Sequence, residues 1–275
     1  MRYKSITVCL DNSAGSSRLL DFSIALAAQN DAHLIGLHLT YAPLILSDPY
    51  AVWAPMMLEW EDTAQKKQDQ SREKFISEAA KAGVNADFSG YRSTDAREVI
   101  AHARASDLAI VAQRNVADSE SDLGSNFPEN VVLKLGRPVL FVPYAGVLPD
   151  KFDTIIVAWN GSREAARAVA DALPFLKAAQ LVKVLSVSEK SADENDLPDM
   201  DIAGYLARHG VNVEIERNDN VHINPADWLL SRAADCDADL LVMGAYGHHR
   251  LIELILGGVT KSILRQMTLP VLMSH

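Results

Sequence analysis

Short apolar runs rich in β-branched residues alternate along the chain with longer segments that carry apolar residues at helical spacing. In the first half the runs cover residues 5–10, 33–39, 86–90, 107–112 and 138–142, and the helical pattern covers 16–29, 59–82, 95–104 and 124–135. In the second half the runs cover 154–159, 181–187, 211–216, 239–243 and 270–273, and the helical pattern covers 163–175, 198–209, 224–235 and 258–267. Runs such as IIVAW and PVLFV are apolar almost throughout, which is typical of strands buried on both faces of a parallel sheet. The pattern therefore predicts a doubly wound α/β architecture with right-handed crossovers.

The second half of the chain repeats the first. Four segments match in the same order: ITVCLDNS with IIVAWNGS, GVNADF with GVNVEI, SDLAIVA with ADLLVMG, and GRPVLFVP with TLPVLMSH. Such ordered self-similarity indicates a tandem duplication. We expect two five-stranded domains, 1–145 and 152–275, joined by the turn-like stretch PYAGVLPDKFD at 143–153.

Composition and charge narrow the function classes. The chain has 48% hydrophobic and 23% charged residues, which is typical of a globular protein, and a formal net charge of −10. Neither half is basic, which argues against nucleic acid as the main partner but leaves a mononucleotide open. No apolar run reaches the length of a bilayer span, and the N-terminus does not resemble a signal peptide, so we expect a cytoplasmic protein with no membrane partner. Cys9 and Cys236 are expected to be buried free thiols.

The stretch GAYGHHRLIELILGGVT, residues 244–260, follows directly after a predicted strand. In open α/β sheets ligands bind beyond the carboxyl ends of the strands. Gly257 and Gly258 precede a predicted helix, whose free N–H groups suit a phosphate, and Thr260 adds a hydroxyl. The stretch can be interpreted as a phosphate-binding loop, or as glycines that only permit turns and close packing. It contains neither a Walker loop nor a dinucleotide fingerprint.

Gly244, Gly247 and Gly257 fit the pattern G-x2-G-x9-G, which resembles that of the universal stress protein family. The segments LDNS and WNGS are similar to the family's V-D-x-S start, and the resemblance covers both halves, so the chain is identified as a tandem, UspA-like member. This resemblance implies an adenine nucleotide alpha hydrolase-like fold with five strands per domain. It also implies an intramolecular pseudo-dimer in which the final strands of the two domains pair, with further homodimerisation left open. A stress-response role, and ATP or AMP binding in some members, are implied too.

The resemblance also supplies a set of site residues. The residues expected around a nucleotide are Asn160, Val187 and Met243 at the base, and Gly244, Gly247, Gly257, Gly258, Val259 and Thr260 at the phosphates and ribose. Two of them depart from the family pattern. Gly258 stands where the family usually has Ser or Thr, and Asn160 stands where an aspartate is expected; an amide still forms hydrogen bonds but lacks the charge. Beyond Mg²⁺ accompanying ATP, no metal is expected.

The first half departs from the family pattern in the opposite way. It keeps Asp11, but Ala112, Asn115, Ser125 and Asn126 occupy the places of the four glycines. Asp118, Glu120 and Asp122 add negative charge to the same loop. Since side chains and anions both oppose a triphosphate, we expect this half to bind ATP poorly. The alternative is that Gly124 and Ser125 rebuild the loop.

One further segment suggests a different function. The apolar, aromatic stretch 41–60 contains three prolines, which argues against a regular strand or helix. It can serve as a lid or as a surface for a protein partner or hydrophobic ligand, or simply pack against the fold. An interaction module that uses this stretch is therefore the alternative to nucleotide binding.

No catalytic residue is assigned. Ser13 and Ser162 suit helix N-caps better than nucleophiles, and Ser16 or Ser17 is expected to cap the helix 16–29. His38 is expected to be a buried, hydrogen-bonded core residue. His248 and His249 are interpreted as solvated residues rather than phosphate ligands. With no general base in place, any ATP hydrolysis should be slow, and a nucleotidyl transferase is the least supported interpretation because its catalytic motifs are absent.

Overall fold

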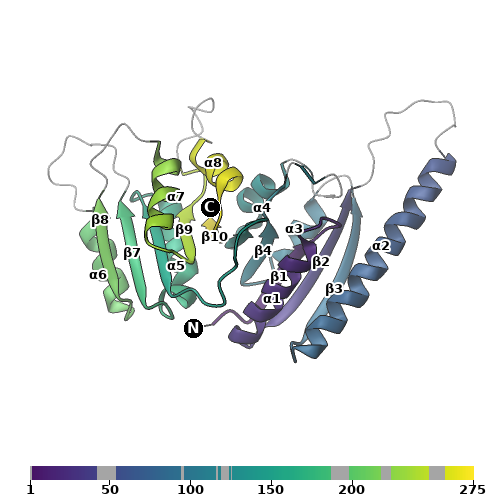
Figure 1. Ribbon diagram of the computed structural model, residues 1–275, viewed down its shortest axis with the longest axis horizontal. Coiled ribbons are helices and arrows are strands. Elements are labelled where there is room, and N and C mark those ends of the chain that lie inside the picture. The colour runs from purple at the N-terminus through teal and green to yellow at the C-terminus, as the bar shows by residue number, and fades with distance from the viewer. Residues whose placement is uncertain are drawn as a thin grey trace. The chain divides into compact units, whose positions relative to one another are not determined.

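The computed structural model describes residues 2–41, 54–93, 96–115, 117–118, 124, 126–186, 198–217, 224–247 and 258–275. The chain divides into two compact units, a first unit of Arg2–Leu135 and a second unit of Gly136–His275. Each unit alternates strands with helices, as the hydrophobic pattern predicts (Figure 1).

The first unit contains four parallel strands in the order β3-β2-β1-β4. Its elements are β1 (Ser5–Leu10), α1 (Ser16–Asn30), β2 (His33–Tyr41), α2 (Ala54–Lys81), β3 (Ala86–Ser93), α3 (Arg97–Ala103), β4 (Leu108–Ala112) and α4 (Phe127–Leu135). The strand order reverses between β1 and β4, which is where ligands bind in sheets of this kind.

The second unit repeats this order and adds two strands, one parallel and one antiparallel. Its elements are β5 (Val139–Val142), β6 (Thr154–Trp159), α5 (Arg163–Leu176), β7 (Leu181–Ser186), α6 (Pro198–Arg208), β8 (Val213–Arg217), α7 (Pro225–Asp235), β9 (Leu240–Gly244), α8 (Gly258–Gln266) and β10 (Val271–Ser274). Five strands are parallel in the order β8-β7-β6-β9-β10. β5, the final strand of the first repeat, pairs antiparallel with β10, the final strand of the second. This is the pairing that the family resemblance implies.

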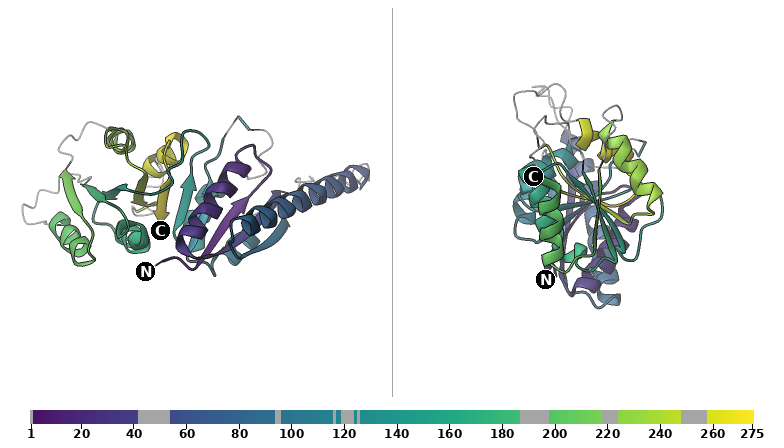
Figure 2. Two further views of the ribbon diagram at one scale, coloured as in Figure 1. Left: turned by 60° about the horizontal axis from the view of Figure 1, so that its bottom comes forward. Right: turned by 90° about the vertical axis from the view of Figure 1, so that its left-hand side faces the viewer.

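In each unit, helices cover both faces of the strands. In the second unit α5 and α6 lie on one side of the strands and α7 and α8 on the other (Figure 2). In the first unit α2 covers the face that carries Gly36, because the Phe75 ring lies where a side chain on that glycine would project. Tyr91 projects from β3 to the opposite face, where its hydroxyl meets His102 of α3. Strands covered on both sides explain the nearly continuous apolar runs.

Some boundaries differ from the sequence prediction. Helix α2 begins at Ala54 rather than at residue 59, so the end of the 41–60 stretch is helical and that part of the prediction is wrong. Pro55 lies in the first turn, where its missing N–H costs no intrahelical hydrogen bond. Residues 42–53 lie outside the described part of the chain. The predicted cap of α1 is also wrong, because Gly15 occupies the N-cap position and makes no side-chain cap bond.

The two cysteines differ in environment. Cys9 is buried in β1, and burial raises the pKa of its thiol to about 12. Cys236 is only half-buried and is the C-cap residue of α7. The prediction of a buried free thiol is therefore confirmed for Cys9 and too strong for Cys236.

Candidate functional site

The carboxyl end of β6 leads into α5 through a short capped turn. Gly161 adopts a positive φ of 72°, and the Asn160 side-chain oxygen accepts a hydrogen bond from the Ser162 N–H at 3.1 Å. The Ser162 hydroxyl oxygen in turn accepts from the Ala165 N–H at 3.2 Å, so Ser162 is the N-cap of α5, as predicted. The exposed Asn160 is thereby held at the start of this helix by its own local hydrogen bond.

Gly244 and Gly247 pack against the beginning of α5. A Cβ atom on Gly244 would lie 2.6 Å from the Ala165 nitrogen, closer than real Cβ atoms approach backbone. A Cβ on Gly247 would lie 3.1 Å from a Glu164 carboxylate oxygen and 3.3 Å from the Ser162 hydroxyl oxygen. Close packing, the alternative left open by the sequence, therefore accounts for glycine at position 244, while at position 247 a side chain would require Glu164 or Ser162 to shift. Their contact with phosphates stays a prediction.

Glu164 is a buried carboxylate that the sequence did not reveal as part of this site. Its residue is 4% exposed, and one carboxylate oxygen lies 2.5 Å from the Nε of Arg163. Burial acts to raise the pKa of Glu164, but the hydrogen bond and charge of Arg163, with a contribution from His275, lower it overall. An acidic residue in a first helical turn is ordinary, so nothing in the sequence distinguished this one from a solvated helix end.

At the start of α8, the described residues leave space beside Gly258. Gly258 is exposed, and no described atom lies within 4 Å of the position that its Cβ would take. The first turn of α8 carries no acidic residue. The buried Thr260 hydroxyl oxygen accepts a hydrogen bond from the Tyr246 N–H at 3.3 Å, which joins the helix to the segment after β9. Tyr246 has a positive φ of 55°, an uncommon conformation for a non-glycine residue.

The remaining predicted site residues fall into two groups. Met243 is buried near the end of β9, and Val259 is half-buried in the first turn of α8. Val187, Gly257, His248 and His249 lie outside the described residues. The structure thus brings Asn160, Gly244, Gly247, Gly258 and Thr260 to the carboxyl-end edge of one sheet.

In the first unit, acidic side chains hold the corresponding turn. The Asp11 carboxylate accepts from the Ser13 N–H at 3.1 Å and from the Ser13 hydroxyl at 2.5 Å. Ser13 is therefore not the N-cap of α1. The Asp118 carboxylate accepts from the Ala14 N–H at 2.9 Å. Two carboxylates at this turn repel an approaching anion.

His38 is fully buried on β2, as predicted, but only partly hydrogen-bonded. Its Nε2 lies 3.3 Å from the Asn12 side-chain oxygen, while Nδ1 has no hydrogen-bond partner among the described residues. Burial, chiefly, lowers the pKa of His38 to about 4; the Asp11 charge opposes this change and the Lys67 charge adds to it. His38 is therefore neutral at pH 7.

Two features are absent from the described segments, a metal-binding cluster and a membrane-spanning helix. Among these residues, no group of three or more His, Cys, Asp and Glu side chains is placed to hold a metal ion. No described helix is long and apolar enough to cross a membrane.

Comparison with known proteins agrees with this architecture. The model of the universal stress protein family matches residues 2–143 and again 151–275. The chain is 27% identical over 178 residues to Universal stress protein Slr1230 of Synechocystis sp., a match that spans 60% of this chain and 57% of that protein. Among solved structures, a universal stress protein from Archaeoglobus fulgidus superposes with a TM-score of 0.73 at 18% identity, covering 98% of this chain and 95% of that one. A functionally unknown protein from Pseudomonas aeruginosa PAO1 gives 0.61 at 16% identity, covering 99% and 92%.

Two repeats with the same strand order, each leading from its first strand into a helix through a tight polar turn, define a tandem doubly wound α/β protein. The family model matches both repeats and nearly the whole chain, and the chain belongs to the universal stress protein family.

Proposed function

We propose that the second unit binds an adenine nucleotide, ATP or AMP, and that the protein acts in a cytoplasmic stress response. The phosphates would lie against the N-terminus of α8, near Gly258 and Thr260. The base would lie near Asn160 and Met243, at the ends of β6 and β9. Any Mg²⁺ would arrive with ATP. Domain boundaries at 1–145 and 152–275 are part of this proposal.

The observation that supports this proposal most directly is the space that the described residues leave beside Gly258 at the start of α8. A helix N-terminus presents unsatisfied N–H groups and a positive dipole end. No described atom lies within 4 Å of the position that a Cβ on Gly258 would take, and the first turn contains no acidic residue. An anion can therefore approach the main chain closely.

The decisive experiment is a thermal unfolding series of the full chain with ATP, with AMP and without ligand. Binding to the folded state raises the unfolding midpoint in proportion to the logarithm of ligand concentration above the Kd. Gly258→Asp should abolish that rise, because it places a carboxylate where the phosphate would lie. Its Cβ has open space, so the variant should fold normally. A Gly247 variant is less suitable, because any side chain there meets Glu164.

Two controls separate the outcomes. Val147→Asp adds the same charge at a side chain that is 91% exposed, and it should leave the ATP response intact. Asp11→Ala tests the first unit and should also leave the response intact. A chain that shows no shift at millimolar ATP contradicts the proposal and favours an interaction module instead. A shift that survives Gly258→Asp but disappears with Asp11→Ala would assign the nucleotide to the first unit.

A further inference from the structure

A separate pocket of about 350 Å³ lies at the outer edge of the first unit's sheet, along β3. This volume lies within the range of small-ligand sites. Its lining combines four apolar residues with four polar or charged ones: Ile35, Ile76, Ala86 and Phe88, then Arg72, Asp87, Ser89 and His102. Because it involves the first half of β3 rather than the carboxyl ends of β1 and β4, it is distinct from any nucleotide site of this fold.

The pocket is rich in available hydrogen-bond donors. Arg72 makes no ion pair or hydrogen bond with any described residue, although a guanidinium carries five N–H donors. The Tyr91 hydroxyl lies 2.5 Å from the His102 Nδ1. We assign the phenol as the donor in this bond, which leaves the imidazole hydrogen on Nε2. Asp87 is the acidic residue of the pocket. Its carboxylate forms a hydrogen bond with His33, whose Nε2 lies 2.9 Å away.

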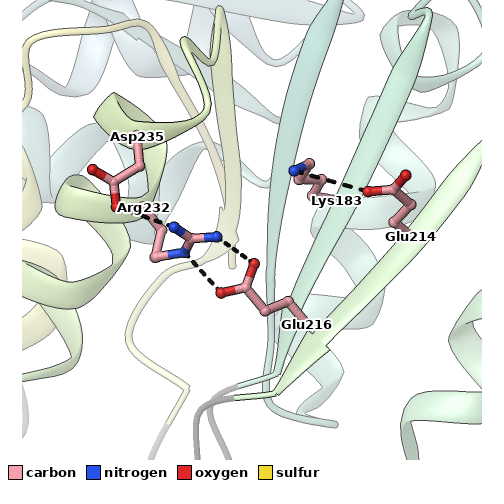
Figure 3. A network of polar contacts seen from close by, with 5 residues as sticks. All are labelled: Lys183, Glu214, Glu216, Arg232 and Asp235. Atoms are coloured by element: carbon pink, nitrogen blue, oxygen red, sulfur yellow. Dashed lines mark hydrogen bonds and ion pairs between the residues drawn. The ribbon is translucent and has the colours of Figure 1, made fainter.

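The second unit shows what occupies the same place in the other repeat. The strand registers align β2 and β3 with β7 and β8, so that Lys183, Glu214 and Glu216 correspond to Ile35, Asp87 and Ser89. There the Arg232 guanidinium donates hydrogen bonds to both oxygens of the Glu216 carboxylate, from Nε at 2.7 Å and from Nη2 at 2.6 Å (Figure 3).

A second ion pair completes that network. The Lys183 ammonium lies 3.8 Å from Glu214, and Arg232 also holds Asp235 at 3.0 Å. The second unit therefore fills this position with its own paired charges. In the first unit the residue that corresponds to Glu216 is Ser89, and the cation of the pocket, Arg72, comes from α2 rather than from α3, the counterpart of α7.

We propose that the β3-edge pocket binds a small organic carboxylate with an apolar body. The ligand carboxylate lies beside Ser89 at the edge strand β3, where it receives hydrogen bonds from His102 on the α3 side and from Arg72, which lines the same pocket from α2 on the other side. Ile35, Ile76 and Phe88 contact the apolar body. Arginine suits this role because its planar fork matches a carboxylate.

Phenylacetate is a suitable probe, titrated into the full chain by calorimetry. Its neutral analogue 2-phenylethanol and its cationic analogue phenethylamine keep the ring and change only the charge. We expect saturable binding of phenylacetate and at least about tenfold weaker binding of both analogues. In a methyl-labelled sample, the signals of Ile35 and Ile76 should move during the titration.

Two variants test the assignment independently. Arg72→Gln, at an exposed helix position, should weaken phenylacetate binding by about tenfold. Ser89→Glu should abolish binding, because it restores the internal carboxylate of the second repeat. Lys66→Gln removes an equal charge from the same helix outside the pocket, and it should change the affinity less than twofold. The proposal is overturned if phenylacetate does not saturate, if the three probes bind equally, or if Arg72→Gln leaves the affinity unchanged.

Discussion

The Asp118 carboxylate of the first unit accepts a hydrogen bond from the Ala14 N–H, in the segment between the first strand and the first helix. In the second unit the residue that approaches the corresponding segment is Gly247, which lies against Ser162 and Glu164. One repeat therefore closes this turn with a carboxylate from the loop after β4, and the other leaves a glycine there. The two copies therefore differ in the residue that the loop brings to this turn, a carboxylate in the first unit and a glycine beside the Glu164 carboxylate in the second.

The Asp118 contact should contribute measurably to stability. Asp118→Ala removes a charged acceptor from a partly solvated N–H, and we expect the free energy of unfolding to fall by about 0.5–1.5 kcal/mol. Asp21→Ala is the matched control, because Asp21 is exposed on α1 and forms no described contact. Urea unfolding of both variants gives the comparison. Equal stabilities would show that the Asp118 bond is not maintained in solution.

Alanine substitutions at two glycines of the second unit should differ in their effect on stability, because the surroundings of the two glycines differ. Gly244→Ala forces a methyl group to within 2.6 Å of the Ala165 nitrogen, so we expect a loss of about 1–3 kcal/mol. Gly258→Ala meets open space and replaces a flexible residue at a helix start, so the stability should change by less than about 1 kcal/mol. Denaturant midpoints at constant m-value measure both. Should Gly244→Ala prove neutral, the packing of β9 on α5 would have to be looser than described.

Serine substitutions at the starts of α5 and α1 should also differ in their effect on stability. Ser162→Ala removes the side-chain cap of α5 and should cost about 0.5–2 kcal/mol. Ser16→Ala lies in the first turn of α1, where the cap position belongs to Gly15, and should cost less than about 0.5 kcal/mol. Thermal or urea unfolding distinguishes these values. A larger loss at Ser16 than at Ser162 would contradict the observed caps.

His38 should make stability depend on acidity between pH 6.5 and 4. Its pKa falls from the ordinary 6.5 to about 4 in the folded protein, so in this window the unfolded chain binds a proton that the folded chain does not. The contribution of His38 to the free energy of unfolding is therefore fully present above pH 6.5. It is lost as the pH falls, which lowers the free energy of unfolding by about 3 kcal/mol in total.

The test compares the wild type with His38→Gln, which cannot titrate. The difference between their free energies of unfolding should change by about 3 kcal/mol between pH 7 and pH 4. Asp11 and Lys67, the charged groups that act on His38, are unchanged in both proteins. Parallel pH profiles would mean that His38 is not buried in neutral form.

The division of the chain into repeats follows from local pattern. Continuous apolar runs such as those of β6 and β9 can bury their alternating side chains only in a sheet covered on both faces. The four matched segments place each run at the same point in each copy. The cap at Ser162 was equally predictable, because a serine between a strand and an acidic helical turn offers its oxygen to the next N–H groups. The start of α2 was not, because proline reads as a breaker unless its position in the first turn is known.

The sequence alone determined the tandem α/β fold and the place where each repeat turns from strand to helix, because periodicity and capping act over a few neighbouring residues. Only the tertiary structure decided which groups face each other across distant segments. It showed Gly244 pressed against Ala165, Asp118 bound to Ala14, and Glu216 held by Arg232 where the first repeat has a pocket beside Ser89. Such contacts depend on how strands and helices pack in three dimensions. The spacing of residues along the chain does not determine which distant segments come into contact.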